Sequence, residues 1–513
     1  MGTGRVVVVG AGMGGLVAAL LLARQGLAVT VVERAACPGG KLRQVAIGDA
    51  RIDAGPTVFT MRGVFDEIFA LAGASLESHV KLRPLEVLAR HAWSGGQPLD
   101  LFADIERSVD AIGRFAGSSD AVRYRTFCAR ARQSFDVLER AFIRTSRPNL
   151  PGLMRNAGLS GIGSLWRAGP FSTLWNALGE HFHDSRLRQL FGRYATYGGA
   201  SPFSASATLM VIAHVERSGI WTVEGGMYRI AQAIELLASL QGVAFRYGAE
   251  AREVLVKNGR ATGVGLAGGE RLAADAVVLN ADAAAVARGL LGKAIAGTIP
   301  AQPRSNRSLS AITWAMIART DGFPLLHHSV FFSGNYRAEF DNIFRHQRLP
   351  VEPTVYVCAQ DRTDRDDVAL SGDERLLCLV NAPPTGDMHS LPTSEIDACE
   401  ERTFHLLRRA GLNVYRRSET TVRTTPTDFD RLFPATGGAL YGQAQHGWMA
   451  SFRRPGARTR MPGLYLTGGS THPGPGLPMV ALSGKQAAAS LLSDLASIAG
   501  SSVTATHGGM STR

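Results

Sequence analysis

The chain has 513 residues, of which 45% are apolar and 19% are charged. Such a length favours two domains over one core, and the composition is that of a globular protein. The net charge of +12 comes mostly from scattered arginines, so the sequence lacks the dense basic block that binds nucleic acid. This charge is compatible either with a solvated surface or with attraction to an anionic membrane face.

No unbroken apolar run of 18 residues occurs, so no membrane-spanning helix is predicted. The 5 cysteines are odd in number and far apart, and neither C-x-x-C nor H-E-x-x-H is present. This pattern predicts a reducing compartment, no disulfide framework and no metal site. His181, His183 and the His327–His328 pair are therefore interpreted as ordinary structural or surface residues.

The amino-terminal stretch predicts a dinucleotide site. Four valines, residues 6–9, read as a buried parallel strand, and a second strand ends at Glu33. Between them a G-x-G-x-x-G turn opens a helix whose positive end would face a pyrophosphate, and Glu33 could accept from a ribose hydroxyl. The candidate residues of this turn are Gly10, Gly12, Met13, Gly14 and Gly15. Two weaker alternatives are that the glycines serve only a tight turn, and that this stretch is a secretory signal.

Two further glycine stretches follow the second strand. Arg34 is followed by Gly39-Gly40-Lys41, a loop suited to phosphate or to a flavin edge. Gly55-Pro56-Thr57 lies between apolar residues and is interpreted as backbone packed against the cofactor.

The middle of the chain is expected to be helical from about Gly63 to Ile143. Residues 120–142 carry an apolar stripe that favours a helix packed on its own domain. Residues 149–182 combine apolar residues, tryptophans and arginines, which suits either a membrane-interface segment or ordinary core helices. Residues 193–202 form a polar-aromatic patch that ends in a turn.

A second series of strands and helices then begins. A helix over 228–240 follows Gly225-Gly226-Met227, and a strand at 243–247, a hairpin across Asn258-Gly259 and a buried strand at 276–280 come next. Alternating stretches at 354–358 and 376–380 predict a second sheet.

The second diagnostic stretch lies at residues 463–479 and again reads strand, glycine turn, helix. Its candidate cofactor contacts are Gly468, Gly469, Pro478 and Met479, because the glycines allow close backbone approach and the helix end is positive. His472 is a weak candidate for proton transfer and could only brace the turn. The helix is expected to end near Ser497, and residues 501–513 are expected to be disordered.

Together, the dinucleotide fingerprint, Pro38-Gly39-Gly40-Lys41, residues 53–57 and the Thr471-His472-Pro473-Gly474 stretch resemble the bacterial-type carotenoid (phytoene) desaturases. Pro475 departs from the family, which usually has a small residue there. The resemblance implies FAD as cofactor, wrapped by these stretches, with the backbone of Val254 meeting the adenine. It also implies that Gly225-Gly226-Met227 returns the chain to the cofactor domain.

The resemblance implies an α/β fold, a Rossmann-like FAD-binding domain of the amine-oxidase type with an inserted mixed α+β substrate domain. The expected FAD-binding domain is discontinuous and comprises residues 1–85, 230–295 and 455–500. Residues 86–229 and 296–454 would form the substrate and membrane-contact domain.

Residues 53–66 and 193–202 most resemble hydroxyneurosporene (methoxyneurosporene) desaturases, which are 1-hydroxycarotenoid 3,4-desaturases. The implied reaction is hydride transfer from an acyclic carotenoid to flavin, with quinone or oxygen as electron acceptor. The enzyme would sit peripherally on the cytoplasmic side of the inner membrane. Phytoene desaturase, carotenoid isomerase, flavin amine oxidase and a non-enzymatic membrane-binding protein remain alternatives, and NAD in place of FAD is disfavoured.

Overall fold

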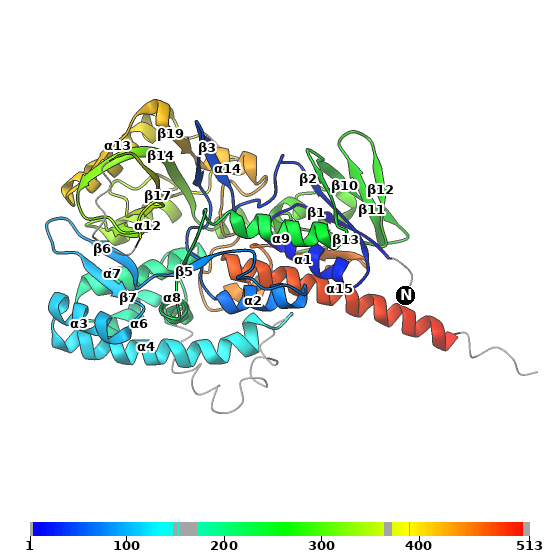
Figure 1. Cartoon of the computed structure of the whole chain (residues 1–513), viewed down its shortest axis with the longest axis horizontal. Helices are drawn as coiled ribbons and strands as arrows, with labels where there is room; N and C mark the ends of the chain where they lie inside the picture. The colour runs from blue at the N-terminus through cyan, green and yellow to red at the C-terminus, as the bar shows by residue number, and fades with distance from the viewer. Residues whose placement is uncertain (1–3, 147–151, 153–171, 364–371, 389, 506–513) are drawn as a thin grey trace, which may run out of the picture.

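The structure is a computed structural model and describes residues 4–146, 152, 172–363, 372–388 and 390–505. Two regions lie side by side along its longest axis, each built around its own large sheet (Figure 1).

The first region holds a five-stranded sheet in the order β20-β13-β1-β2-β9, and every neighbouring pair is parallel. Its strands are β1 (Arg5–Val9), β2 (Ala28–Glu33), β9 (Ala244–Tyr247), β13 (Ala276–Leu279) and β20 (Leu464–Leu466). The strands predicted at the amino terminus, near 243–247 and near 276–280 are confirmed.

The four valines of β1 alternate between two cores, since successive side chains of a strand point to opposite faces. Val6 and Val8 pack with the helical layer, and Val7 and Val9 pack with a small antiparallel sheet. The helices are α1 (Met13–Arg24), α9 (Arg229–Leu240) and α15 (Leu477–Ala505). The small sheet is β10 (Ala251–Lys257), β11 (Arg260–Leu266) and β12 (Arg271–Ala273). Its first turn is the predicted Asn258-Gly259, where Asn258 has a φ of 51°.

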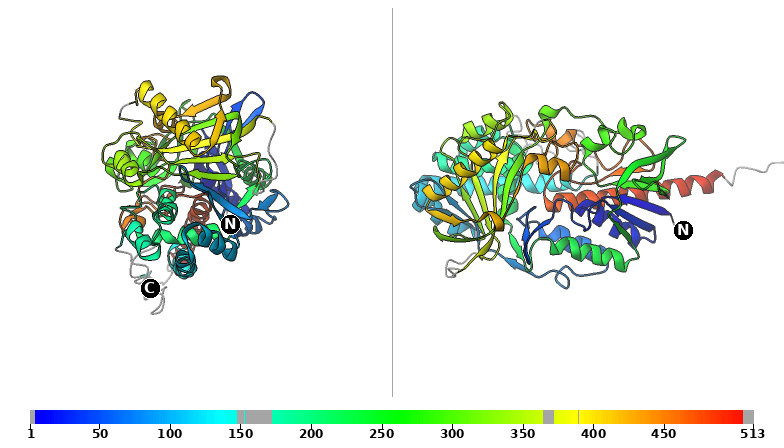
Figure 2. Two further views of the ribbon diagram at one scale, coloured as in Figure 1. Left: turned by 90° about the vertical axis from the view of Figure 1, so that its left-hand side faces the viewer. Right: turned by 90° about the horizontal axis from the view of Figure 1, so that it is seen from above.

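Helix α15 is longer than expected, because it continues past Ser497 to Ala505 and extends away from the body of the molecule (Figure 2). The first residues of the segment predicted to be disordered are thus helical. Residues 506–513 lie outside the described part of the chain.

The second region contains an eight-stranded mixed sheet in the order β18-β14-β17-β16-β15-β6-β7, with β19 also paired to β14. Only the β6–β15 pair is parallel among these strands. The strands are β6 (Val87–Ala92), β7 (Leu99–Phe102), β14 (Ser310–Gly322), β15 (His328–Phe331), β16 (Val355–Ala359), β17 (Glu374–Ala382), β18 (Leu412–Tyr415) and β19 (Thr421–Thr424). The predicted second sheet is confirmed in β16 and β17.

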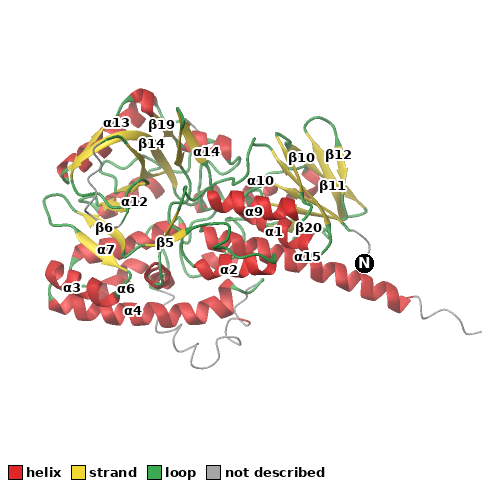
Figure 3. Cartoon of the chain, viewed as in Figure 1, coloured by secondary structure: helices red, strands yellow, loops and turns green. Residues whose placement is uncertain are grey.

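Helices cover both faces of this sheet (Figure 3). On one face, α13 (Thr393–Arg409) sets Phe404 against Trp314 of β14. The layer on the other face comprises α3 (Ile105–Ala116), α4 (Ser118–Leu138), α6 (Leu174–His181), α7 (Ser185–Gly192) and α8 (Val211–Arg217). The predicted apolar stripe of 120–142 does pack inward at Phe127 and Phe135, but Val122 is exposed.

The expectation of mainly helical structure from Gly63 to Ile143 is wrong for residues 82–102, which form β5 (Leu82–Pro84), β6 and β7. These strands are short. Strand β5 pairs with the distant β8 (Trp221–Val223) and β6 with the distant β15, while β6 and β7 form a local hairpin. Of the segment 149–182, residues 149–151 and 153–171 lie outside the described residues, and its end forms helix α6, which is buried along one face.

A hairpin of β3 (Gln44–Ile47) and β4 (Ala50–Asp53) joins the two regions. The side chain of Gln360 accepts from the backbone of Asp53 at 3.0 Å and donates to its carbonyl at 2.8 Å. This hairpin, expected within the cofactor domain, therefore contacts the large sheet. The remaining elements are α2 (Arg62–Leu71), α10 (Ala283–Ala287), α11 (Lys293–Ala296), α12 (Tyr336–Phe344) and α14 (Pro426–Leu432).

Candidate active site

The predicted glycine turn lies between β1 and α1 and leaves no room for side chains. A Cβ on Gly15 would lie 2.1 Å from the carbonyl oxygen of Gly10, and one on Gly12 would lie 2.6 Å from Asn280 Oδ1. Gly10 has a φ of 99°. The turn thus presents bare backbone at the start of α1, where unpaired N–H groups and the helix dipole favour a phosphate.

The two glycine stretches, far apart in sequence, meet at this turn. A Cβ on Gly14 would lie 2.5 Å from Thr467 Oγ1 and 3.2 Å from the backbone nitrogen of Gly468. The amide of Asn280 donates to the Thr467 carbonyl at 3.2 Å and so fixes the end of β20 beside α1. The amino-terminal and carboxyl-terminal stretches therefore form one site.

Glu33 ends β2 with its carboxylate at the turn. Its two oxygens accept from the backbone N–H groups of Ala11 and Ala35, each at 2.8 Å. A carboxylate can accept about four hydrogen bonds, so it keeps capacity for a ribose hydroxyl.

The Gly39–Lys41 loop closes over the same turn. The backbone N–H of Gly39 donates to the Ala11 carbonyl at 2.8 Å. Lys41 donates to the Leu440 carbonyl at 2.7 Å, and burial lowers the pKa of its ammonium although Asp282 opposes this shift. A Cβ on Gly55 would lie 1.9 Å from the Lys41 carbonyl oxygen, which explains a glycine there.

Arg454, which no sequence motif singles out, supports the second glycine turn. Its buried guanidinium donates to the carbonyls of Tyr441 at 3.1 Å, Gly469 at 3.0 Å and Gln443 at 2.7 Å. Burial lowers its pKa to about 10. Helix α15 begins directly after this turn, so the positive end of its dipole lies beside the turn.

A cavity of about 1020 Å³ runs from these turns into the second region. The predicted residues that line it are Gly10, Gly12, Met13, Glu33, Arg34, Gly39, Gly40, Lys41, Gly55, Pro56, Thr57, Gly468, Gly469, Pro478 and Met479. Its far part is lined by apolar side chains, among them Phe135, Leu209, Ile212, Leu377 and Leu379. The bare-backbone cradle, the two helix ends and Glu33 fit a dinucleotide such as FAD, and the apolar chamber fits a hydrocarbon.

Four predicted residues stand behind the cavity wall instead of in it. Gly14 and Gly15 pack at the start of α1. Val254 is buried in the small sheet, and its N–H donates to Leu291 at 2.9 Å, while Arg252 reaches the cavity. His472 is 2% exposed, and its Nε2 donates to the Phe142 carbonyl at 3.1 Å.

The sequence did not predict a cluster of polar side chains that lies in the apolar chamber. Arg193, Tyr197, Glu216 and Tyr356 all line the cavity. The sequence marked residues 193–202 only as a polar-aromatic patch. Glu216 and Tyr356 come from α8 and β16, so only folding brings them to it.

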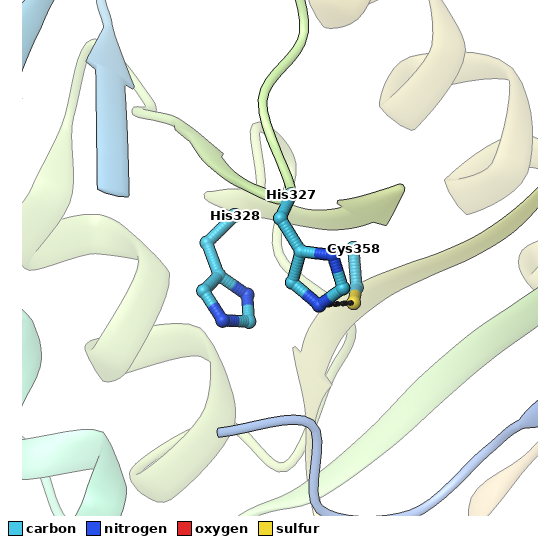
Figure 4. A group of neighbouring side chains, drawn as sticks. All are labelled: His327, His328 and Cys358. Atoms are coloured by element: carbon cyan, nitrogen blue, oxygen red, sulfur yellow. Dashed lines mark hydrogen bonds between the residues drawn. The ribbon is translucent and has the colours of Figure 1, made fainter. Parts of the chain in front are cut away.

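Figure 4 shows the side chains of His327, His328 and Cys358 gathered together. Their potential ligand atoms lie within 4.8 Å of one another. His327 Nδ1 bonds the Arg362 carbonyl at 2.9 Å, and its Nε2 lies 3.8 Å from Cys358 Sγ. His328 Nδ1 bonds the Tyr356 hydroxyl at 2.7 Å, whereas its buried Nε2 has no hydrogen-bond partner among the described residues. Burial raises the pKa of the Cys358 thiol to about 12, so it is protonated at neutral pH. We interpret this group as structural support for Tyr356.

The fold and this cavity define a flavin-dependent oxidoreductase. Residues 13–492 match the family described as Flavin containing amine oxidoreductase. The chain is 56% identical to a hydroxyneurosporene desaturase of Rubrivivax gelatinosus, over 100% of this chain and 97% of that protein. It is 44% identical to a hydroxyneurosporene desaturase of Cereibacter sphaeroides, over 96% of this chain and 98% of that protein.

Among solved structures, an oxidoreductase from Methanosarcina mazei shares the fold with a TM-score of 0.60 and 17% identity, over 94% of this chain and 99% of that one. The chain belongs to the flavin containing amine oxidoreductase family and, within it, to the carotenoid desaturases. It is an FAD-dependent oxidoreductase, as the resemblance implied.

Proposed function

We propose that this chain introduces the C3–C4 double bond into acyclic 1-hydroxy- or 1-methoxy-carotenoids. The supporting observation is the continuous cavity in which a dinucleotide cradle opens into an apolar chamber that contains a few buried polar groups. The names of the relatives at 56% and 44% identity point to the same substrate class.

In this proposal, the cradle residues position the cofactor. The backbone at Gly10, Gly12 and Gly468, which borders the cavity, would approach the dinucleotide, and Glu33 would accept from its ribose. Bound FAD supplies a two-electron acceptor for a hydride from the carbon beside the polyene. Arg252, rather than the buried Val254, borders the cavity on the side of the small sheet where the adenine is expected.

The apolar chamber contributes by binding the carotenoid and by excluding water from it. Leu377 and Leu379 of β17 and Leu209 and Ile212 near α8 bury the hydrocarbon, so the developing positive charge on the polyene is shielded from attack by water. After hydride departure, a proton leaves the neighbouring carbon, and the electron pair of that C–H bond becomes the new double bond. His472 is behind the wall, which argues for a bracing role.

We further propose that the protein acts peripherally on the cytoplasmic side of the inner membrane and passes electrons to quinone or oxygen. No helix in the described residues is long and apolar enough to cross a bilayer. A carotenoid is dissolved in lipid, and the net charge of +12 would favour an anionic surface. Co-sedimentation with anionic and neutral vesicles, at low and high salt, tests this part.

The decisive experiment follows the flavin absorption of the purified protein under anaerobic conditions. Hydroxyneurosporene in liposomes should bleach the flavin band and yield a product lighter by two hydrogens. Bleaching with phytoene but not with hydroxyneurosporene would reverse the choice of substrate. A product of unchanged mass would indicate an isomerase, and peroxide release with simple amines would indicate an amine oxidase.

A further inference from the structure

A charged side chain stands in the wall of the apolar chamber. Arg193 begins the short 3₁₀ helix η2 (Arg193–Gly198) directly after α7, and it lines the cavity together with Tyr197 and Glu216. Its guanidinium carbon lies 5.5 Å from the ring centre of Tyr197 and 5.3 Å from that of Tyr356. Burying a cation is costly, so such a group requires a compensating partner or a ligand.

The acidic partner of Arg193 is Glu216, which reaches it through a phenol. Arg193 Nη1 donates to the Tyr197 hydroxyl at 3.5 Å, and that hydroxyl donates to Glu216 Oε1 at 2.6 Å. Tyr194 donates to the other oxygen of Glu216 at 2.7 Å. Burial acts to lower the pKa of Arg193, but the neighbouring Tyr197 and Glu216 outweigh it and the pKa is raised, so the guanidinium remains charged.

Arg193 therefore has donors to spare. A guanidinium carries five N–H donors and no acceptor, and the long contact to Tyr197 uses one of them. Glu216, in contrast, is satisfied by two phenols. The unused hydrogen-bonding groups of the cluster are therefore the N–H donors of Arg193, which face an apolar space. The ligand that suits them is a single oxygen atom on a hydrocarbon.

The cluster also adjoins the cradle that would hold the flavin. The hydroxyl of Tyr356, over whose ring Arg193 is placed, bonds Thr57 Oγ1 at 2.7 Å. Thr57 belongs to the Gly55-Pro56-Thr57 stretch of the cofactor cradle. In a 1-oxygenated carotenoid, the oxygen is only a few bonds from the C3–C4 bond to be oxidised. A residue that recognises this oxygen must lie close to the residues that would hold the flavin, and Arg193 adjoins them through Tyr356 and Thr57.

We infer that Arg193, held in place by Tyr197 and Glu216, binds the oxygen at C1 of the carotenoid and thereby selects substrates with an oxygenated end group. This inference rests on the proposed function. It also accounts for both substrate types. Arginine only donates hydrogen bonds, and a hydroxyl oxygen and a methoxy oxygen can both accept one. A substrate without this oxygen would leave buried N–H groups unpaired.

The test compares anaerobic flavin bleaching by hydroxyneurosporene with bleaching by the same carotenoid without the C1 oxygen. The wild-type protein should prefer the oxygenated substrate, and Arg193→Met should reduce this preference by about 10- to 100-fold, the range expected for a hydrogen bond to a charged group. The loss should fall mainly on the hydroxylated substrate and on its KM. Arg193→Lys should retain part of the preference, since it keeps the charge but not the planar fork.

Arg319→Met is the matched control, because Arg319 is exposed and stacks on Tyr415 at 4.5 Å outside the cavity. It should leave the preference unchanged. Flavin content and thermal unfolding verify that each variant is folded. If Arg193→Met does not retain flavin, the same comparison is made with Tyr197→Phe. This variant keeps the ring but removes the hydroxyl that links Arg193 to Glu216, so it should also reduce the preference.

An Arg193→Met protein that holds flavin and keeps the wild-type preference would overturn the inference. The inference also fails if Arg193→Met slows only reoxidation by quinone. If no carotenoid bleaches the flavin of the wild-type protein, the proposed function itself has failed, which is a separate result.

Discussion

The carboxylate of Asp53 accepts a hydrogen bond from the backbone N–H of Met227 at 2.6 Å, although the two residues are 174 positions apart. It also accepts from Tyr228 at 3.4 Å and from Gln44 at 3.1 Å. A Cβ on Gly226 would lie 2.4 Å from the same carboxylate, so the glycine is required for this contact. Asp53 thereby ties the β3–β4 hairpin to the start of α9, where the chain returns to the cofactor region.

Asp53→Ala should therefore destabilise the protein by about 2–4 kcal/mol, because it leaves buried N–H groups at the start of α9 without acceptors. Denaturant unfolding monitored by circular dichroism measures the change. Asp49→Ala, an exposed residue in the turn of the same hairpin, should change the stability by less than about 0.5 kcal/mol. Equal effects of the two substitutions would contradict the assigned role of Asp53.

Gly15→Ala should abolish flavin binding while Gly63→Ala should not. The new methyl group at position 15 would collide with the Gly10 carbonyl at 2.1 Å and displace the turn, whereas position 63 has open space. The ratio of flavin to protein absorbance after purification reports the outcome. Gly63 lies in helix α2, so its replacement by alanine should be neutral or slightly stabilising. A flavin-replete Gly15→Ala protein would show that the turn is not the cradle.

Glu33→Gln should weaken FAD binding by about tenfold, the effect of losing one charge-assisted hydrogen bond. The amide has only one acceptor oxygen, so it cannot satisfy Ala11, Ala35 and a ribose hydroxyl together. Fluorescence titration of the flavin-free protein with FAD measures the dissociation constant. Glu77→Gln, on an exposed residue paired with Arg62, is the control and should bind FAD normally. An unchanged constant for Glu33→Gln would remove Glu33 from the site.

His472→Phe should keep the pH profile of flavin bleaching, because His472 braces the glycine turn against Phe142 and does not border the cavity. Burial lowers the pKa of His472 to about 4. The folded state thus resists protonation of this ring, and the wild-type stability should decrease as the pH falls from 6.5 towards 4.

This part of the pH dependence should be absent in His472→Phe, which urea unfolding at several pH values would reveal. A variant that holds flavin but bleaches at least a hundredfold more slowly, with a shifted pH profile, would instead place His472 in proton transfer.

Much of the cofactor half could be predicted because its determinants are local. Each glycine of the first turn sits at a fixed offset from β1, and the strand, helix and acid follow in register, so the strand–turn–helix unit and the place of Glu33 at the end of β2 could be predicted directly. The hairpin at Asn258-Gly259 is equally local. The β6–β7 hairpin, which turns near Gly95-Gly96, is also local but was not recognised. Strands β5 and β6 were missed because they pair with residues 221–223 and 329–331. Local periodicity carries no signal for such long-range pairing.

The residues of the apolar chamber could not be predicted from the sequence, because they come from distant segments. Arg193, Glu216 and Tyr356 are ordinary residues of three separate elements, and their chemistry arises only when a shared cavity removes water from them. A guanidinium would be commonplace at the surface. Inside an apolar chamber its charge acts in a lower dielectric and interacts more strongly with its neighbours.

The sequence alone determined the dinucleotide turn, its cofactor class and the carotenoid desaturase resemblance, since backbone geometry at a glycine turn depends on residues a few positions apart. Only the tertiary structure decided which of the candidate residues face the cavity, that Val254 and His472 stand behind its wall, and that an arginine lies next to the cradle. Those facts depend on packing between distant segments, and a local pattern does not encode that packing.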